Sequence, residues 1–310
     1  MELTSLLVAT DLSPRSIRVA TFAGLLAQRL DIPATYVHVD ELATVSIHDS
    51  AEAREYLDHI VSLREQGLRS LAEALSRAGL DAPDVQVLQG RARDVLVPYA
   101  TDNGLGAIAI AQRSSEALDQ HLLGSTSRRV LKAATMPVIA IPPEVTLPTA
   151  RPVDFGPVVA PVDLDESATH AIRAARDWAR KLEAALYVVH ALDFPNMADY
   201  LKADANDLLR RVGWRMRLQA VARLAELASP VGIDREHQLV VDGASPAEAV
   251  EAQAEKLGAG FYVVPATGKG TIARFFLGST SNRLVKLARR PVLVLPRSWL
   301  DEREEATAAP

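Results

Sequence analysis

The 310-residue chain contains no cysteine, which excludes disulfides, thiol catalysis and every cysteine-ligated metal site. No apolar run reaches membrane-spanning length, and the first residues lack the basic flank and apolar core of a signal peptide. A basic excess is missing too, since the net charge is −5, so a nucleic acid is a poor first hypothesis for the ligand. These absences favour a protein of the reducing cytoplasm without membrane insertion.

Motifs of common catalytic sites are also missing. The sequence has no Gly-x4-Gly-Lys-Ser/Thr phosphate loop, no Gly-x-Ser-x-Gly elbow and no His-Glu-x2-His zinc helix. The histidines do not form pairs at metal-ligand spacing, so structural packing is the favoured interpretation for His38 and His190. We therefore assign no reaction, no catalytic residue and no metal site, and keep weak ATP hydrolysis as an alternative.

What the chain does contain is an internal repeat. The pentapeptide Leu-Gly-Ser-Thr-Ser at 123–127 recurs at 277–281, and Pro-Val opens an apolar run at both 137 and 291. Upstream, Asp11, His38 and Gly90 match Asp163, His190 and Gly243 at offsets of 152 or 153 residues. The length also suits two domains of about 150 residues each.

Five prolines lie between 142 and 157, where apolar periodicity is weak, and this stretch predicts a linker. We expect a first domain over 1–143, a Pro-rich linker over 144–156, a second domain over 157–298 and a polar tail over 299–310.

Each half predicts the same alternation of buried strands and amphipathic helices. The strands expected in the first half cover 6–9, 34–39, 85–88, 107–111 and a run from 137, and its helices begin near Ser13 and cover about 50–79, 92–101 and 125–134. The strands expected in the second half cover 158–160, 186–190, 238–241, 261–264 and a run from 291, and its helices begin after 165–167 and cover about 198–228, 246–257 and 279–289. This alternation predicts two doubly wound, five-stranded parallel sheets of the α/β class, each covered on both faces.

Ligands of such sheets bind beyond the carboxyl ends of the strands. Asp11 and Asp163 stand at strand ends, and the Gly-Ser pairs at 124–125 and 278–279 open the last helices. A helix start offers unpaired N–H groups and a positive dipole end to a phosphate. Serine is also a preferred helix cap and Asp a preferred turn residue, so both interpretations stay open here.

Both halves resemble universal stress proteins. The first half carries the resemblance at 9–13, 38–39 and 123–125, and the second at 161–163, 190–191, 268 and 277–279, within the spans 3–142 and 156–297. It implies a Rossmann-like, adenine nucleotide α-hydrolase-like fold, and a pseudo-dimer in which the final strands, 138–141 and 292–295, meet as antiparallel edges. It also implies a stress-response sensor or regulator that binds ATP, with Mg²⁺, or ADP or AMP.

The family's ATP-binding members use Gly-x2-Gly-x9-Gly-Ser/Thr after the fourth strand, and this chain departs from that pattern. The first two glycines fall on Ala111 and Ser114 in the first half, and on Pro265 and Gly268 in the second. A Cβ restricts positive φ, and proline also loses its N–H. The resemblance therefore favours a nucleotide site in the second domain and a degenerate site in the first.

The residues that the resemblance implies for each site share the strand ends and the last helix start. In the favoured second domain they are Pro161, Val162, Asp163, Ala191, Val264, Gly268, Gly278, Ser279, Thr280 and Ser281. In the degenerate first domain they are Ala9, Thr10, Asp11, Val39, Ala111, Ser114, Gly124, Ser125, Thr126 and Ser127. In the family the aspartate contacts the adenine, and Val39 and Ala191 lie where the ring packs.

Two alternatives remain. A scaffold without ATP would act through an unknown protein partner or another small ligand, and the departures from the glycine pattern favour it. A weak ATPase would need a group that positions water, and the sequence names none. Arg128, Arg129 and Arg283 lie within one turn of the last helix starts, where they add contacts to phosphate or are simply solvated. A further homodimer of the pseudo-dimer is also open.

Overall fold

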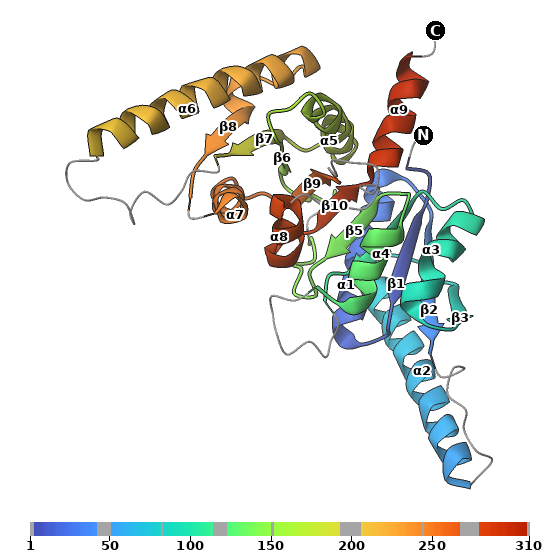
Figure 1. Ribbon diagram of the computed structural model, residues 1–310. Coiled ribbons are helices and arrows are strands. Elements are labelled where there is room, and N and C mark those ends of the chain that lie inside the picture. The colour runs from blue at the N-terminus through green and yellow to red at the C-terminus, as the bar shows by residue number, and fades with distance from the viewer. Residues whose placement is uncertain are drawn as a thin grey trace. The chain divides into compact units, whose positions relative to one another are not determined.

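The computed structural model describes residues 3–41, 51–81, 83–113, 123–149, 152–192, 206–243, 245–266 and 279–308. The chain divides into two compact units, Met1–Val153 and Asp154–Pro310 (Figure 1). Each unit is an α/β domain, and each is described by itself below.

The first unit alternates strands and helices around a parallel sheet. Its strands are β1 (Leu6–Thr10), β2 (Ala34–Asp40), β3 (Val85–Gln89), β4 (Ala107–Ala111) and β5 (Val138–Ile141). Its helices are α1 (Pro14–Leu30), α2 (Ala51–Arg77), α3 (Ala92–Asp102) and α4 (Ser125–Ala133). The strand order is β3-β2-β1-β4-β5, with every pair parallel. The order reverses direction at β1 and β4, which is where ligands of doubly wound sheets bind.

The second unit repeats this topology. Its strands are β6 (Val158–Pro161), β7 (Leu186–Ala191), β8 (Gln238–Val241), β9 (Phe261–Pro265) and β10 (Val292–Leu295). Its helices are α5 (Ala168–Leu182), α6 (Asn206–Ala228), α7 (Pro246–Lys256), α8 (Ser279–Leu287) and α9 (Arg297–Ala308), with 3₁₀ turns at Ser229–Val231 and Arg235–His237. The order β8-β7-β6-β9-β10, again parallel, matches the first unit strand for strand.

Burial explains why the apolar runs form strands. Every residue of β1 and of β9 is buried, because central parallel strands are covered by helices on both faces. The edge strand β3 is only half-buried, and Val87 within it is exposed. The continuous apolar runs therefore mark the strands at the centre of each sheet, where each unit has its core.

Helix starts follow local capping rules. The Ser13 hydroxyl accepts from the N–H of Ser16 at the start of α1, and Ser245 accepts from Glu248 at the start of α7. A proline occupies the first turn of both helices, where its missing N–H is not needed. The strand and helix predictions are confirmed wherever the residues are described; positions 198–205 of the expected long helix lie outside them.

The linker and the tail are more structured than the sequence suggested. Val145 and Phe155, both within the stretch expected to link the domains, are buried. The expected polar tail contains most of α9, which contacts α5 and buries Trp299 to 6% exposure. Burial of an aromatic side chain contributes several kcal/mol to stability. Trp299 therefore holds α9 against the domain, although the polar composition of this segment predicted an exposed tail. Of the described helices, none is long and apolar enough to cross a membrane.

Candidate functional site

A cavity of about 420 Å³ opens in the first unit, beyond the carboxyl ends of β1, β2 and β4. It lies where the order of the parallel strands reverses, as expected for this sheet. Nine of the ten residues predicted for this site line it: Ala9, Thr10, Asp11, Val39, Ala111, Gly124, Ser125, Thr126 and Ser127. The tenth, Ser114, lies outside the described residues.

The floor of the cavity is the hydrophobic core itself. Val37, Leu96 and Ile110 line it and belong to the buried cluster between the sheet and helices α3 and α4. Polar groups stand around this floor, from the β1 turn and from the start of α4. An apolar floor with a polar rim suits a small molecule that has one apolar face and one charged end.

The turn after β1 is held by a chain of hydrogen bonds. Thr10 Oγ1 accepts from the N–H of Leu12 at 3.0 Å and from the hydroxyl of Ser16 at 3.0 Å. Ser16 Oγ in turn accepts from the N–H of Asp11 at 3.1 Å. Asp11 Oδ1 accepts from the N–H of Ser13 at 3.0 Å, which is the turn role that the sequence allowed for it. These bonds fix the side of the cavity formed by β1.

Leu12 adopts a left-handed backbone, with φ of 62°, which is rare for a branched side chain. Its side chain is buried and lies against α2 at Gly67, where a Cβ would come within 2.7 Å of the Cβ of Leu12. The absence of a side chain at Gly67 therefore lets α2 pack closely on the strained turn. The sequence named the turn but not this contact with α2.

Equivalent histidines connect neighbouring strands in both units. His38 Nδ1 lies 3.1 Å from the carbonyl oxygen of Thr10, and His190 Nδ1 lies 2.9 Å from that of Val162. A carbonyl oxygen only accepts, so Nδ1 carries the proton in each ring. These bonds support the structural interpretation of both histidines. In the described part of the chain, no cluster of three or more His, Asp or Glu side chains is placed to hold a metal ion.

The start of α4 faces the cavity with backbone N–H groups that have no acceptor among the described residues. Gly124 is its N-cap and donates its own N–H to the carbonyl of Gln112, while the Ser127 hydroxyl donates to the carbonyl of Ala111 at 2.6 Å. No described residue accepts from the backbone N–H groups of Ser125, Thr126 and Ser127. Three such groups at the positive end of a helix dipole favour an anion. The serine hydroxyl at 127 is thus structural, whereas the backbone is available to a ligand.

Charged residues that the sequence analysis missed also line the cavity. Glu41 follows β2 and accepts from the N–H of Ala92 at 3.0 Å, so its carboxylate caps α3. Arg113 follows β4 and pairs with Glu144 at 2.9 Å. Both positions lie within two residues of a strand end, and the strand-end rule that selected Asp11 applied to them as well.

In the second unit the predicted residues reach the same edge of the sheet. Pro161 ends β6, with Val162 and Asp163 after it, and Ala191 ends β7. Val264 lies in β9, and positions 279–281 open α8. Because β6 lies between β7 and β9, these strand ends are neighbours. Gly268 and Gly278 lie outside the described residues, so the preference for a site in this unit stays a prediction.

Comparison with known proteins matches both halves of the chain to one family. The model of the universal stress protein family matches residues 3–142 and 154–296. Universal stress protein Rv2623 of Mycobacterium tuberculosis H37Rv is 28% identical over 312 aligned positions, covering 94% of this chain and 96% of the relative. Universal stress protein MJ0531 of Methanocaldococcus jannaschii is 26% identical over 140 residues, covering 45% of this chain and 81% of the relative.

Solved structures share the fold along the whole chain. A universal stress protein from Archaeoglobus fulgidus DSM 4304 superposes with a TM-score of 0.63 at 22% identity, covering 96% of this chain and all of that one. A putative universal stress protein from Pseudomonas aeruginosa UCBPP-PA14 gives 0.58 at 20% identity, covering 99% and 98%. At these identities the likeness concerns the fold alone.

Proposed function

Because the chain belongs to the universal stress protein family, we propose that it is a stress-response regulator that binds an adenine nucleotide in the cavity of its first domain. The strongest support is that the apolar floor of the cavity lies next to backbone N–H groups of α4 that have no described acceptor. A nucleotide has the same separation of apolar and charged parts, with a flat base at one end and phosphates at the other.

The residues of the cavity suggest a role for each part of the ligand. Val37, Val39 and Ile110 offer apolar contacts to the base. The backbone N–H groups of Ser125 and Thr126 offer donors to the first phosphate. Asp11 keeps a second carboxylate oxygen that accepts from no described donor, and this oxygen suits an amino or hydroxyl group of the ligand.

Ala111, the first departure from the family's glycine pattern, is compatible with a nucleotide in this cavity. Among the described non-glycine residues, only Leu12, Asp31 and Glu183 have positive φ, so Ala111 keeps an ordinary backbone with its Cβ in place. Gly124 has φ of −56°, which any residue adopts. Backbone N–H groups, not glycine flexibility, are what this site would offer to phosphate.

The second domain remains a second proposed site. Pro265 is the last residue of β9, where a missing N–H does not interrupt the strand interior. Gly268, Lys269 and Gly270 would then approach the phosphates from the loop, as the sequence pattern favours. Binding in either domain would signal the nucleotide state to a partner.

Matched substitutions separate the two sites. Ser125→Glu and Ser279→Glu each place a carboxylate in the first turn of α4 or α8, where it favours the helix dipole but repels phosphate. Isothermal calorimetry with Mg²⁺ and ATP should show a loss of about tenfold or more for Ser125→Glu, which corresponds to about 1.4 kcal/mol. Thermal unfolding should show that both variants stay folded.

The affinities of the two variants distinguish a nucleotide site in the first domain from one in the second. Unchanged affinity in Ser125→Glu together with a loss in Ser279→Glu would reject the first-domain site and support the second. Absence of ATP, ADP and AMP binding in the wild type would reject the nucleotide proposal and favour the scaffold that acts through another ligand or a protein. Mass spectrometry of the gently purified protein would then identify what co-purifies.

A further inference from the structure

A second cleft, of about 430 Å³, lies beside the cavity and between α3 and α4. Its lining consists of Arg93, Asp94, Ser125, Arg128, Arg129 and Lys132. Four of these six side chains are cationic and one is acidic, in a chain whose net charge is −5. The cleft therefore concentrates positive charge against the overall balance of the protein.

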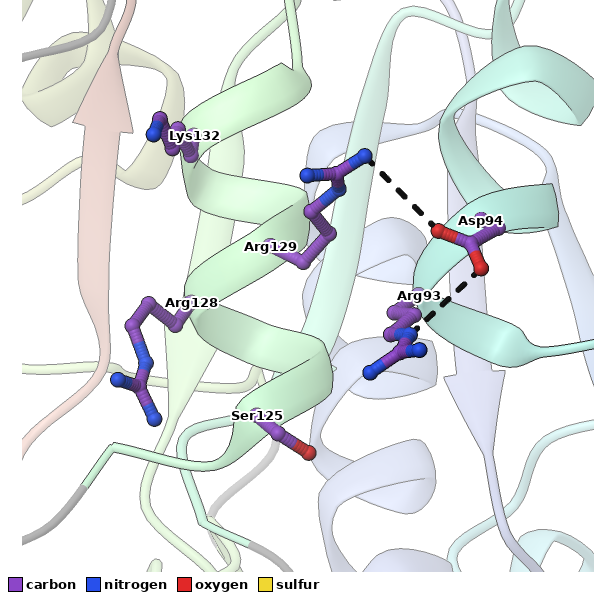
Figure 2. Close-up of a pocket in the computed structure, with 6 residues that line it drawn as sticks. All are labelled: Arg93, Asp94, Ser125, Arg128, Arg129 and Lys132. Carbon is purple, nitrogen blue, oxygen red and sulfur yellow. Dashed lines mark ion pairs between the residues drawn. The ribbon is translucent and has the colours of Figure 1, made fainter.

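Helical spacing gathers the cations of α4 into one stripe. Ser125, Arg128, Arg129 and Lys132 stand at positions i, i+3, i+4 and i+7, which lie on one face of a helix. Figure 2 shows them along α4, with Arg129 directed toward Asp94 on α3 and with Arg128 and Lys132 extending on the other side of α4. The stripe extends about 10 Å along the helix, at about 1.5 Å per residue, so it can contact more than one phosphate group.

The acid in the cleft does not balance these charges. The carboxylate of Asp94 lies 3.6 Å from the guanidinium of Arg93 and 4.0 Å from that of Arg129. One exposed carboxylate thus forms two long ion pairs. Arg128 and Lys132 form no ion pair with any described residue. No acidic residue stands in the first turn of α4, and two arginines follow that turn directly, which opposes the helix dipole. A bound anion would relieve both imbalances.

The second domain supplies an internal comparison. Its α7–α8 pair Glu248–Arg283, at 2.9 Å, stands at the positions of Asp94 and Arg129. However, Ala247 and Asn282 occupy the positions of Arg93 and Arg128. The acid–arginine pair thus recurs in both copies of the fold, whereas the two additional arginines belong to the first domain. Packing of the two helices does not require them.

We propose that this basic cleft is a subsite for the terminal phosphates of a polyphosphorylated nucleotide. Ser125 lines both the cavity and the cleft, so a phosphate chain that begins at the N–H groups of α4 continues onto the stripe. This assignment rests on the proposed nucleotide site in the first domain. It makes Arg93, Arg128 and Lys132 the residues that select for the number of phosphates, since a monophosphate does not reach them.

The test compares nucleotides that differ only in phosphate count. The double variant Arg128→Gln/Lys132→Gln leaves the Asp94–Arg129 pair intact, and Lys286→Gln in α8 is the matched control at the position equivalent to Lys132. Calorimetry on the full-length proteins would measure AMP, ADP and ATP. In the double variant we expect ATP affinity to fall by about tenfold or more and AMP affinity by no more than about twofold, because charge-assisted contacts are strong and local.

Each result of these measurements either supports or overturns the polyphosphate subsite. An unchanged ATP-to-AMP affinity ratio in the double variant would overturn the subsite, whether both affinities fall together or neither falls. If no nucleotide binds the wild type, the proposed function fails, and inorganic tripolyphosphate becomes the probe. Tripolyphosphate that binds the wild type and the Lys286→Gln control but not the double variant would still support a polyphosphate cleft. Equal binding to all three, or no binding, would overturn it.

Discussion

The imidazole of His38 donates through Nδ1 to the main-chain carbonyl of Thr10, 3.1 Å away, and so fastens the end of β2 to the end of β1. Thr10 is also the residue whose hydroxyl organises the turn that carries Asp11. One side chain from a neighbouring strand therefore positions the main chain beneath the cavity. The same bond in the second domain joins His190 to Val162.

Replacement of this histidine should loosen the turn without removing the fold. We expect His38→Leu to lower the free energy of unfolding by about 1–2 kcal/mol, because a partly buried carbonyl loses its donor. Urea denaturation followed by circular dichroism measures this. His190→Leu should have a similar cost, and no change in either variant would show that the bond contributes nothing.

The contact between Gly67 and Leu12 predicts an unusual response to alanine. Alanine is normally better than glycine inside a helix by about 1 kcal/mol, and Gly213→Ala in α6 should gain about that much, because its Cβ meets no described atom within 4 Å. Gly67→Ala in α2 should instead lose about 1–3 kcal/mol, since the new Cβ would lie 2.7 Å from that of Leu12. Opposite signs in thermal unfolding are the expected result, and a gain in both variants would contradict the contact.

Tyr36 in β2 predicts a loss of stability at alkaline pH. Burial raises the pKa of Tyr36 from 10.0 to about 12. Between these two pH values the folded chain keeps a proton that the unfolded chain releases. This group therefore leaves the free energy of unfolding unchanged below about pH 10 and lowers it as the pH rises from about 10 to about 12. The slope from this group is about 1.4 kcal/mol per pH unit.

Comparison of two phenylalanine variants isolates that effect. Tyr36→Phe should show a shallower decline than the wild type in urea unfolding from pH 9 to 11, whereas Tyr56→Phe, at an exposed position of α2, should follow the wild type. Parallel curves for all three proteins would rule out a shifted pKa at Tyr36.

Two of the three tryptophans, Trp299 and Trp214, predict opposite sensitivities to truncation. Trp299 in α9 is 6% exposed, and Trp299→Ala should cost about 3–5 kcal/mol because it leaves a cavity in the second domain. Trp214 in α6 is 64% exposed, and its removal should change stability by no more than about 0.5 kcal/mol. Denaturant unfolding of both alanine variants measures the difference, and equal stabilities would mean that α9 is not anchored by Trp299.

Most of the fold followed from patterns that act over short distances. The apolar runs predicted the ten strands because central parallel strands are buried on both faces, and the repeat of Leu-Gly-Ser-Thr-Ser predicted equivalent starts for α4 and α8. Trp299 and Phe155 were missed, because whether a terminal or linking segment folds back depends on a surface built by distant residues.

The site was predictable only in part. The resemblance to universal stress proteins, together with the strand ends and the Gly-Ser pair, predicted nine of the residues that line the cavity. Glu41 and Arg113 follow strand ends but were not identified, because charged residues are common in loops. The cleft residue Arg93 was not identified because only the packing of α3 against α4 brings it to the cleft.

By itself the sequence determined the duplication, the parallel α/β architecture and the family resemblance, because repeats, periodicity and capping residues are local properties of a chain. Only the tertiary structure decided that the first domain, with Ala111 in place of glycine, has a cavity edged by N–H groups of α4 that no described residue accepts from. The physical reason is that phosphate binding depends on where backbone donors point. That direction is set by how α4 packs against the sheet, not by the identity of one residue in the loop before it.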